Sequence, residues 1–225
     1  MVRATGAQWR LGGVRSLFIQ TEETPNPASL KFLPGKEVLP EEYGSAMEFR
    51  GDTPTNNSPL ARLLMRVNGV SGVFLSNDFV TISKSDQVEW AQLKPEVFAT
   101  IMDFYAADKP AVTGPLEGAQ GDEYPEEESE IVELIKELLE QRIRPMVQED
   151  GGDIFFKGFD EETGIVSVQL AGSCAGCPSS TVTLKNGVEN MLMHYIPEVT
   201  GVHSIGELDE SPDVRVLQYR QDDII

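Results

Sequence analysis

Both cysteines of this 225-residue chain lie in one seven-residue segment, from Gly172 to Pro178, and no other segment constrains the chain as strongly. Cys174 and Cys177 are separated by two residues, a spacing used by metal, cluster and redox sites. Thiolates are soft ligands that select iron–sulfur clusters, zinc or copper(I). Because closed zinc and iron–sulfur sites use four ligands, two thiols leave such a site half complete. We therefore expect two chains to close one site together.

The residues after the cysteines favour the thiolate form. Pro178 suits the first position of a helix, which places Cys177 at or near the N-cap and Cys174 one turn earlier, in the loop. The unpaired N–H groups of Ser179 and Ser180 would then point back toward the sulfurs. These donors and the helix dipole stabilise a thiolate, which is both the nucleophile and the metal ligand.

Other interpretations of the cysteine pair stay open. For zinc, His194 lies 17 residues past Cys177 on the same expected helix, roughly 25 Å away at the helical rise, so we interpret it as a polar residue at a helix end. His203 stands in an expected strand at an unknown distance. A thioredoxin-like redox pair is the main rival, although it expects a βαβ unit before the cysteines. A structural disulfide is disfavoured in a reducing compartment.

Charge and hydropathy exclude several classes of partner. The chain has 18 Lys and Arg against 37 Asp and Glu, a net charge of −19. Nucleic acids and anionic membranes need cationic neutralisation, so neither is expected as a partner. No apolar run reaches the ~18 residues of a membrane span. The first eighteen residues carry three arginines and no acid, which is typical of a mitochondrial transit segment; a disordered tail over residues 1–16 is the alternative.

Hydrophobic periodicity predicts two small domains of the α+β class. In residues 17–106 we expect a ββαββα-like unit, with a helix starting at Ser58, a hairpin around residues 76–78 and an irregular stretch over 37–57. This unit has no Cys and no His, so we interpret it as an interaction domain. Residues 107–126 are rich in Gly, Pro and acids and predict a flexible, acidic linker.

The second domain, residues 127–206, is predicted to run αββαβ. An apolar stripe with acids at its start and arginines near its end predicts a helix that Pro145 kinks or ends. Strands are expected over 154–159 and 165–171, the second leading directly into the cysteines. A helix and a short third strand follow. Residues 207–225 form an acidic tail to which we assign no function.

Three motifs of the second half resemble the C-terminal domain of the NifU-like (Nfu) iron–sulfur scaffold proteins. Their sequences are Ile-Arg-Pro at 143–145, Gln-Glu-Asp-Gly-Gly-Asp at 148–153, and Gly-Ser-Cys-Ala-Gly-Cys-Pro-Ser-Ser at 172–180. Thr-Pro-Asn-Pro at 24–27 and Leu-Lys-Phe at 30–32 resemble the N-terminal domain of the mitochondrial Nfu form. The likeness covers about residues 17–206.

This resemblance implies a scaffold or carrier, not an enzyme, in the mitochondrial matrix. Cys174 and Cys177 correspond to the family's ligands, which implies a 4Fe–4S cluster bridging the two subunits of a homodimer; a 2Fe–2S cluster or zinc fits the same number of sulfurs. Implied partners are upstream cluster-assembly proteins and apo-proteins such as lipoyl synthase, aconitase-type and respiratory enzymes. From the residues alone, a thiol–disulfide oxidoreductase is the alternative function.

Overall fold

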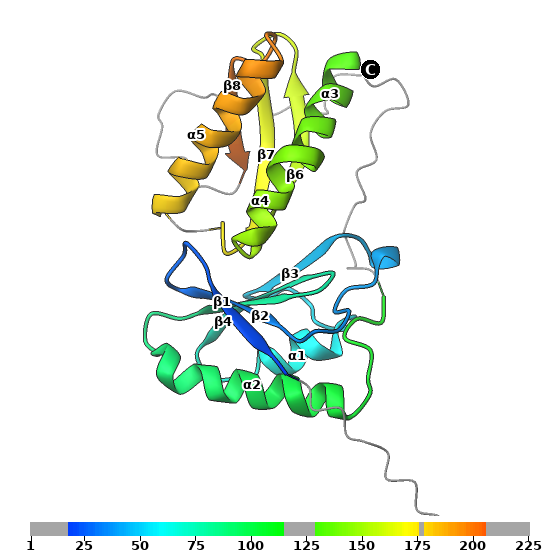
Figure 1. The fold of residues 1–225 in the computed structure, drawn as a ribbon, viewed down its shortest axis with the longest axis vertical. Coiled ribbons are helices and arrows are strands. Elements are labelled where there is room, and N and C mark those ends of the chain that lie inside the picture. Colours follow the sequence, from blue (N-terminus) through cyan, green and yellow to red (C-terminus); the bar gives the residue numbers. More distant parts are fainter. Residues whose placement is uncertain (1–17, 115–128, 176–177, 206–225) are drawn as a thin grey trace, which may run out of the picture.

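The computed structural model describes residues 18–114, 129–175 and 178–205, and the side chains of 178–183 lie outside that description. Two sheets of unequal size follow one another along the long axis of the molecule (Figure 1). A five-stranded sheet belongs to residues 18–114, here the N-terminal unit. A three-stranded sheet belongs to residues 129–205, here the C-terminal unit. The chain is therefore of the predicted α+β class.

The N-terminal unit is an antiparallel sheet in the order β1-β2-β5-β4-β3, with its two α-helices on one face (Figure 1). Its core lies between that face and the helices and includes Phe32, Leu64 and Ile101, each with no exposed side chain. The elements are β1 (Gln20–Glu23), β2 (Ser29–Leu33), the 3-10 turn η1 (Glu41–Tyr43), β3 (Ala46–Arg50), α1 (Pro59–Leu64), β4 (Val70–Ser76), β5 (Val80–Lys84) and α2 (Trp90–Ala106).

The local signals for the first helix and the hairpin are confirmed. The Oγ of Ser58 accepts a hydrogen bond of 3.1 Å from the N–H of Ala61, as a helix N-cap should, and Pro59 is the first residue of α1. Strands β4 and β5 pair antiparallel around the turn at 76–79, where the N–H of Ser76 donates to the carbonyl of Phe79. Both elements therefore form for the reasons that their sequences indicate.

Two expectations for the first half are wrong. The stretch expected to be irregular contains β3, whose buried Met47 and Phe49 alternate with polar residues, so the unit has one strand more than a ββαββα order. The expected linker start at residue 107 is also too early. Ala111 and Val112 are buried in the first core, and the Oγ of Ser58 donates to the carbonyl of Ala111. The rest of the expected linker, from 115, lies outside the described residues.

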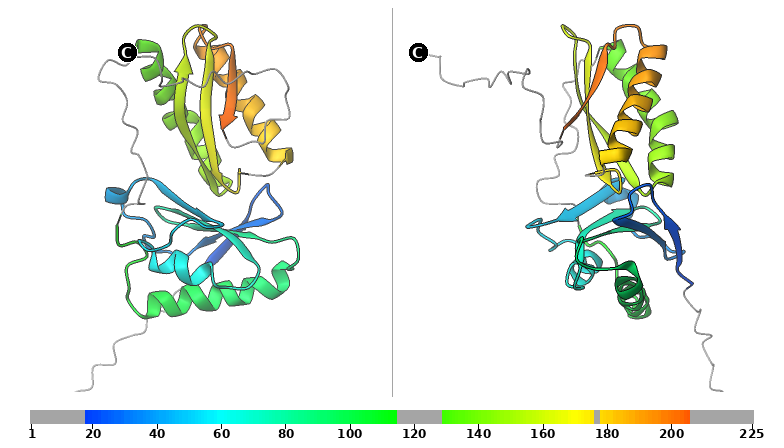
Figure 2. Two further views of the ribbon diagram at one scale, coloured as in Figure 1. Left: turned by 180° about the vertical axis from the view of Figure 1, so that it is seen from behind. Right: turned by 90° about the vertical axis from the view of Figure 1, so that its left-hand side faces the viewer.

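The C-terminal unit has a single layer of helices on one face of the sheet β6-β7-β8 (Figure 2). Strands β6 and β7 form an antiparallel hairpin, and β8 runs parallel to β7. Val168, Leu192 and Ile135 meet in the core between sheet and helices. The elements are α3 (Glu130–Leu138), the π-helical segment η2 (Leu139–Ile143), α4 (Arg144–Glu149), β6 (Gly152–Asp160), β7 (Ile165–Gly172), α5 (Pro178–Tyr195) and β8 (Gly201–Ile205).

Pro145 changes the first helix of this unit without ending it. Proline has no N–H to donate, and its ring clashes with the carbonyl four residues earlier in a regular α-helix. The chain forms the π segment η2 up to Ile143 and continues from Arg144 as α4, whose second residue is the proline, up to Glu149. π-Helical turns are rare and occur mostly as single turns inside α-helices, as η2 does between α3 and α4. The helix is therefore six residues longer than an end at Ile143 would allow.

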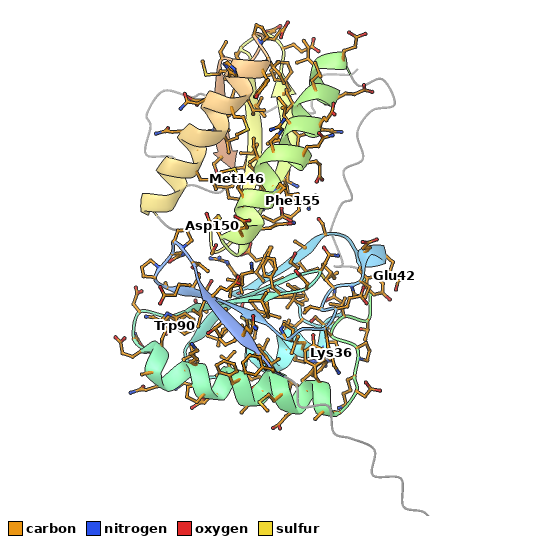
Figure 3. All side chains as sticks on the ribbon, in the orientation of Figure 1. Lys36, Glu42, Trp90, Met146, Asp150 and Phe155 are labelled. Carbon is orange, nitrogen blue, oxygen red and sulfur yellow. The ribbon has the colours of Figure 1, made fainter. Side chains whose placement is uncertain are left out.

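The two units are in direct contact. The lower end of the C-terminal unit lies on the face of the five-stranded sheet that α1 and α2 leave uncovered (Figures 1 and 2). Phe74 and Phe79 from the first unit form a buried cluster with Ala171 of the second, and Phe155 packs against it. Figure 3 shows Phe155 and Asp150 at this boundary. Both faces of the central strands are thus covered, and the sheet's second covering layer is the other unit.

Candidate cysteine site

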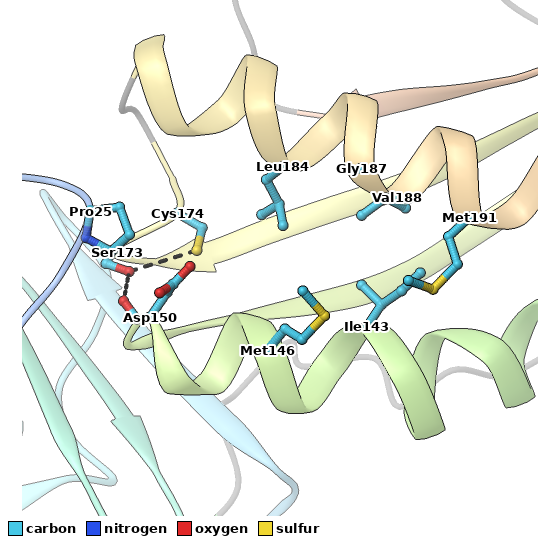
Figure 4. Close-up of a pocket in the computed structure, with 10 residues that line it drawn as sticks. All are labelled: Pro25, Ile143, Met146, Asp150, Ser173, Cys174, Leu184, Gly187, Val188 and Met191. Carbon is cyan, nitrogen blue, oxygen red and sulfur yellow. Dashed lines mark hydrogen bonds between the residues drawn. The ribbon is translucent and has the colours of Figure 1, made fainter.

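Cys174 lies just past the end of β7, at the boundary between the two units (Figure 4). Strand β7 ends at Gly172, which has a positive φ of 69°, and the chain then turns through Ser173 to Cys174. The Cys174 side chain is buried, with 4% exposed. Cys174 is thus in a loop, as predicted, but its side chain is sheltered from solvent. Cys177, the second predicted ligand, lies outside the described residues, as do the serine side chains that follow it.

Glycines make the space that the sulfur occupies. A Cβ at position 152 would lie 2.6 Å from the Sγ of Cys174 and 2.6 Å from the carbonyl oxygen of Ala171. A Cβ at position 172 would lie 2.7 Å from the carbonyl oxygen of Gly151, in a backbone conformation that already favours glycine. The Gly151-Gly152 turn and Gly172 are therefore in contact, and a side chain on Gly172 would push the two backbone segments apart.

A small polar network lies next to the sulfur. The Oγ of Ser173 is 3.7 Å from the Sγ of Cys174 and hydrogen-bonds to the backbone carbonyl of Asp150. Burial, followed by the charge of Glu149, raises the pKa of the Asp150 carboxyl, against a lowering effect of Lys31. The loop before β6 and the cysteine loop are thus joined through a hydroxyl.

An ion pair fixes the helix that enters this loop. The Nε and Nη2 of Arg144 donate to the two carboxylate oxygens of Asp153 at 2.8 and 2.9 Å, and the Asp153 side chain is fully buried. One of those oxygens also accepts the N–H of Ile154 at 2.8 Å. Burial alone would lower the pKa of Arg144, but the hydrogen bonds and charge of Asp153 raise it. This bidentate geometry anchors α4 to the start of β6.

A cavity of about 510 Å³ opens beside Cys174, between α4 and α5 (Figure 4). Its walls are mostly apolar, and its polar residues gather at the cysteine end, where Asp150 and Ser173 lie. The lining residues are Pro25, Ile143, Met146, Asp150, Ser173, Cys174, Leu184, Gly187, Val188 and Met191. A hollow with one soft ligand at its polar end can accommodate a group larger than a metal ion.

Sequence reasoning missed the residues that the first unit contributes. Pro25 lines the cavity, and the Nδ2 of Asn26 donates a 3.0 Å hydrogen bond to the carbonyl of Ser173. Both belong to the Thr-Pro-Asn-Pro turn, which the sequence marks as a stiff turn but does not place. Nothing in the sequence marks Asn26 as buried: only the structure shows that it is 8% exposed and that its amide therefore needs a partner.

The two histidines are exposed. His194 lies in the last turn of α5 with its ring at 4.9 Å from that of Tyr195, which agrees with a polar residue at a helix end. His203 lies on β8, opposite Ser167 of β7. In the part of the chain that the structure describes, no three His, Cys, Asp or Glu side chains gather as a metal-binding group. Within the same residues, no helix has the length and hydropathy to cross a membrane.

Comparison with known families assigns each unit separately. Residues 19–108 match the family described as "Scaffold protein Nfu/NifU N terminal". Residues 135–203 match the family described as "NifU-like domain". The order is that of the resemblance seen in the motifs, and the second match contains the whole cysteine segment.

Curated relatives are similar over most of the chain. A "NifU-like protein" of Schizosaccharomyces pombe is 48% identical over 215 residues, 95% of this chain and 82% of that protein. The human "NFU1 iron-sulfur cluster scaffold homolog, mitochondrial" is 52% identical over 89% of this chain and 76% of its own length. Its Drosophila yakuba namesake is 55% identical over 94% and 73%. These names confirm the predicted mitochondrial localisation. The chain belongs to the NifU-like (Nfu) scaffold family and carries both of the family's domains.

Proposed function

We propose that this chain is an iron–sulfur scaffold or carrier that is not an enzyme. Its cargo is a 4Fe–4S cluster held between two copies by Cys174 and Cys177 of each, and its recipients are apo-proteins of the mitochondrial matrix, lipoyl synthase and aconitase-type and respiratory enzymes among them. The observation that carries the proposal is the Cys174 sulfur at the polar end of a cavity of about 510 Å³. Family membership and the relatives' names support the scaffold role.

The donor set fits this cargo better than it fits a single-chain metal site. Two cysteines supply two of the four thiolates that a 4Fe–4S cluster takes, so a second copy is needed to supply the rest. Gly152 leaves space next to the sulfur. Ligands divided between two chains can be exchanged one pair at a time, which suits a protein that releases its cargo.

The burial of Cys174 weighs against the oxidoreductase alternative. Thiol–disulfide exchange requires a thiolate to approach a sulfur directly, so the reacting cysteine must be accessible. With 4% of its side chain exposed, Cys174 is sheltered from an incoming protein disulfide.

Anaerobic reconstitution with iron and sulfide tests the proposal. We expect a broad visible iron–sulfur band, four iron and four sulfide per dimer by 4Fe–4S stoichiometry, and a shift from monomer to dimer in gel filtration on loading. Cys174→Ser and Cys177→Ser should each abolish loading, whereas His194→Ala and His203→Ala should load like the parent. A loaded monomer, or stoichiometric iron in either cysteine variant, would contradict the assignment.

A further inference from the structure

Six backbone polar groups, at the ends of α4 and β7 and in the turns that follow them, are bound by side chains of the N-terminal unit. They are the carbonyls of Gln148, Glu149, Gly151, Gly172 and Ser173, and the N–H of Gly172. One turn joins α4 to β6, and the other carries β7 into the cysteine. The partners come from β2, β3, β5 and the turn before β2. The N-terminal unit therefore holds both sides of the site.

Gly172 is held at both of its peptide groups by one ion pair of β3. Its N–H donates to the Oε1 of Glu48 at 3.1 Å, and its carbonyl accepts from the Nη2 of Arg50 at 2.8 Å. Glu48 and Arg50 are two residues apart on one strand, so their side chains share a face, and they pair with each other at 2.6 Å. The pair fixes the residue at which β7 turns toward Cys174.

Asn26 and Thr81 hold the neighbouring residues. The Oδ1 of Asn26 accepts the N–H of Ala28 at 2.9 Å, which orients the side chain so that its Nδ2 points at the carbonyl of Ser173. The Oγ1 of Thr81, 1% exposed, donates to the carbonyl of Gly151 at 2.7 Å. The Asn26 amide is thus oriented within the first unit, so docking costs it little conformational entropy.

Lys31 holds the end of the entering helix. Its Nζ donates to the carbonyls of Gln148 and Glu149 at 3.2 and 3.4 Å. These are the last two residues of α4, where a cation is favoured by the helix dipole. Glu22, at 3.1 Å, partly compensates the lysine charge. A residue of the Leu-Lys-Phe motif thus caps a helix more than a hundred residues away in sequence.

We propose that the N-terminal unit is part of the cluster site, with Asn26, Arg50 and Thr81 as positioning residues for the loop that carries Cys174. The inference rests on the proposed function, because it concerns how firmly that loop holds a cluster. When the unit is docked, these contacts hold the loop that carries Cys174 in one conformation. When it undocks, the loop loses its partners and the cluster is released sooner.

Linkage gives the proposal a direction. A contact that stabilises the loaded conformation of the loop favours retention, and loading must favour docking by the same factor. In release, each iron–sulfur bond to Cys174 is replaced by a bond to a thiolate of the acceptor, Cys174 takes up a proton, and no electron is transferred. Weakening the docking contacts should therefore weaken retention. We expect this as faster loss of cluster to a chelator, whereas saturating iron and sulfide should still fill the site.

Two variants of the full chain test this, each with a matched control. Thr81→Val keeps the shape and removes the hydroxyl, and Thr81→Ser restores it. Arg50→Gln removes the charged group that donates to the carbonyl of Gly172. Its control is Arg62→Gln, which removes an exposed arginine of α1, on the opposite face of the sheet. The readouts are iron per dimer, the rate of cluster loss to a chelator, amide exchange at Gly172 and Ser173, and thermal unfolding as a check of folding.

We expect Thr81→Val and Arg50→Gln to load the same iron as the parent, yet to lose it about fivefold faster, the effect of one hydrogen bond. Amide exchange at Gly172 should accelerate in Arg50→Gln, and both controls should match the parent. Loaded, folded variants that release cluster at the parent's rate would overturn the inference while leaving the scaffold role intact. A parent chain that takes up no cluster would instead refute the proposed function, and the inference with it.

Discussion

Gly152 and Cys174 are in such close contact that a single methyl group would separate them. A Cβ on Gly152 would lie 2.6 Å from the Sγ and 3.2 Å from the Cβ of Cys174. It would also lie 2.6 Å from the carbonyl oxygen of Ala171, so turning the cysteine side chain away would not relieve the clash. The first residue of β6 therefore determines where the sulfur can be.

Replacing Gly152 by alanine should displace the cysteine loop. Overpacking of this kind costs about 1–3 kcal/mol, and here the strain acts directly on a cluster ligand. We expect Gly152→Ala to lower the free energy of unfolding in urea by that amount and to reduce iron loading. Gly158→Ala, in the same strand with no atom within 4 Å of the added Cβ, is the control. Equal loading by both variants would show that the loop adapts freely.

The pairing of Arg144 with Asp153 gives a larger expected effect. Asp153 is fully buried, and removing the guanidinium leaves a buried carboxylate without its countercharge. Breaking such a pair typically costs about 3–5 kcal/mol. We expect Arg144→Met to lower the free energy of unfolding in urea by about that much. The control is Arg142→Met, at an exposed position of η2, which should change the free energy of unfolding by less than about 0.5 kcal/mol. A loss below about 1 kcal/mol would mean that water replaces the arginine.

The elements that sequence reasoning placed correctly are those with local causes. Ser58 accepts a hydrogen bond only three residues away, and the turn after Ser76 joins two strands that are adjacent in sequence. Pro178 likewise predicted a helix that starts just after the cysteine loop, and α5 begins at Pro178. Short-range chemistry of this kind can be read from one segment at a time.

The contacts around Cys174 could not be found in that way. Asn26 and Ser173 are 147 residues apart, and Arg50 and Gly172 are 122 apart. The sequence around one member of such a pair therefore does not indicate which residue is the other. One indirect signal was present. Val73, Phe74 and Leu75 form a continuous apolar run, which in a strand indicates that both faces are covered. The run implied a second layer but could not say that the other half of the chain supplies it.

Tyr105 should make the N-terminal unit sensitive to alkali. Burial raises the pKa of its hydroxyl to about 12, from a usual value of 10.0. The unfolded chain ionises first, so this contribution to stability is complete below about pH 10 and is lost as the pH rises toward 12. The parent should lose about 2 kcal/mol between pH 9 and pH 11.5 that Tyr105→Phe retains.

A second tyrosine of the N-terminal unit, Tyr43, also has a raised pKa, so the comparison must be between the parent and the Tyr105→Phe variant. A hydrogen bond that its hydroxyl donates to Glu42, followed by the negative charge of Glu42, raises the pKa of Tyr43, and this contribution is the same in parent and variant. The Tyr105 hydroxyl donates only a 3.5 Å hydrogen bond, to the carbonyl of Glu37, so its removal should cost little at neutral pH. Urea unfolding at both pH values measures the difference. Parallel losses in the two proteins would place the ionisation elsewhere.

Because the Cys174 side chain is buried, we expect its thiol to be alkylated slowly in the cluster-free protein. With 4% of the side chain exposed, reaction with iodoacetamide must wait for the loop to open. The reduced Cys177→Ser variant reports on Cys174 alone. In a chain lacking both native cysteines, Met146→Cys gives a matched control, because Met146 lines the same cavity and is 58% exposed. Cys174 should react at least about tenfold more slowly than the control thiol. Equal rates would show that the Cys174 sulfur is as accessible as the control thiol and would contradict its burial.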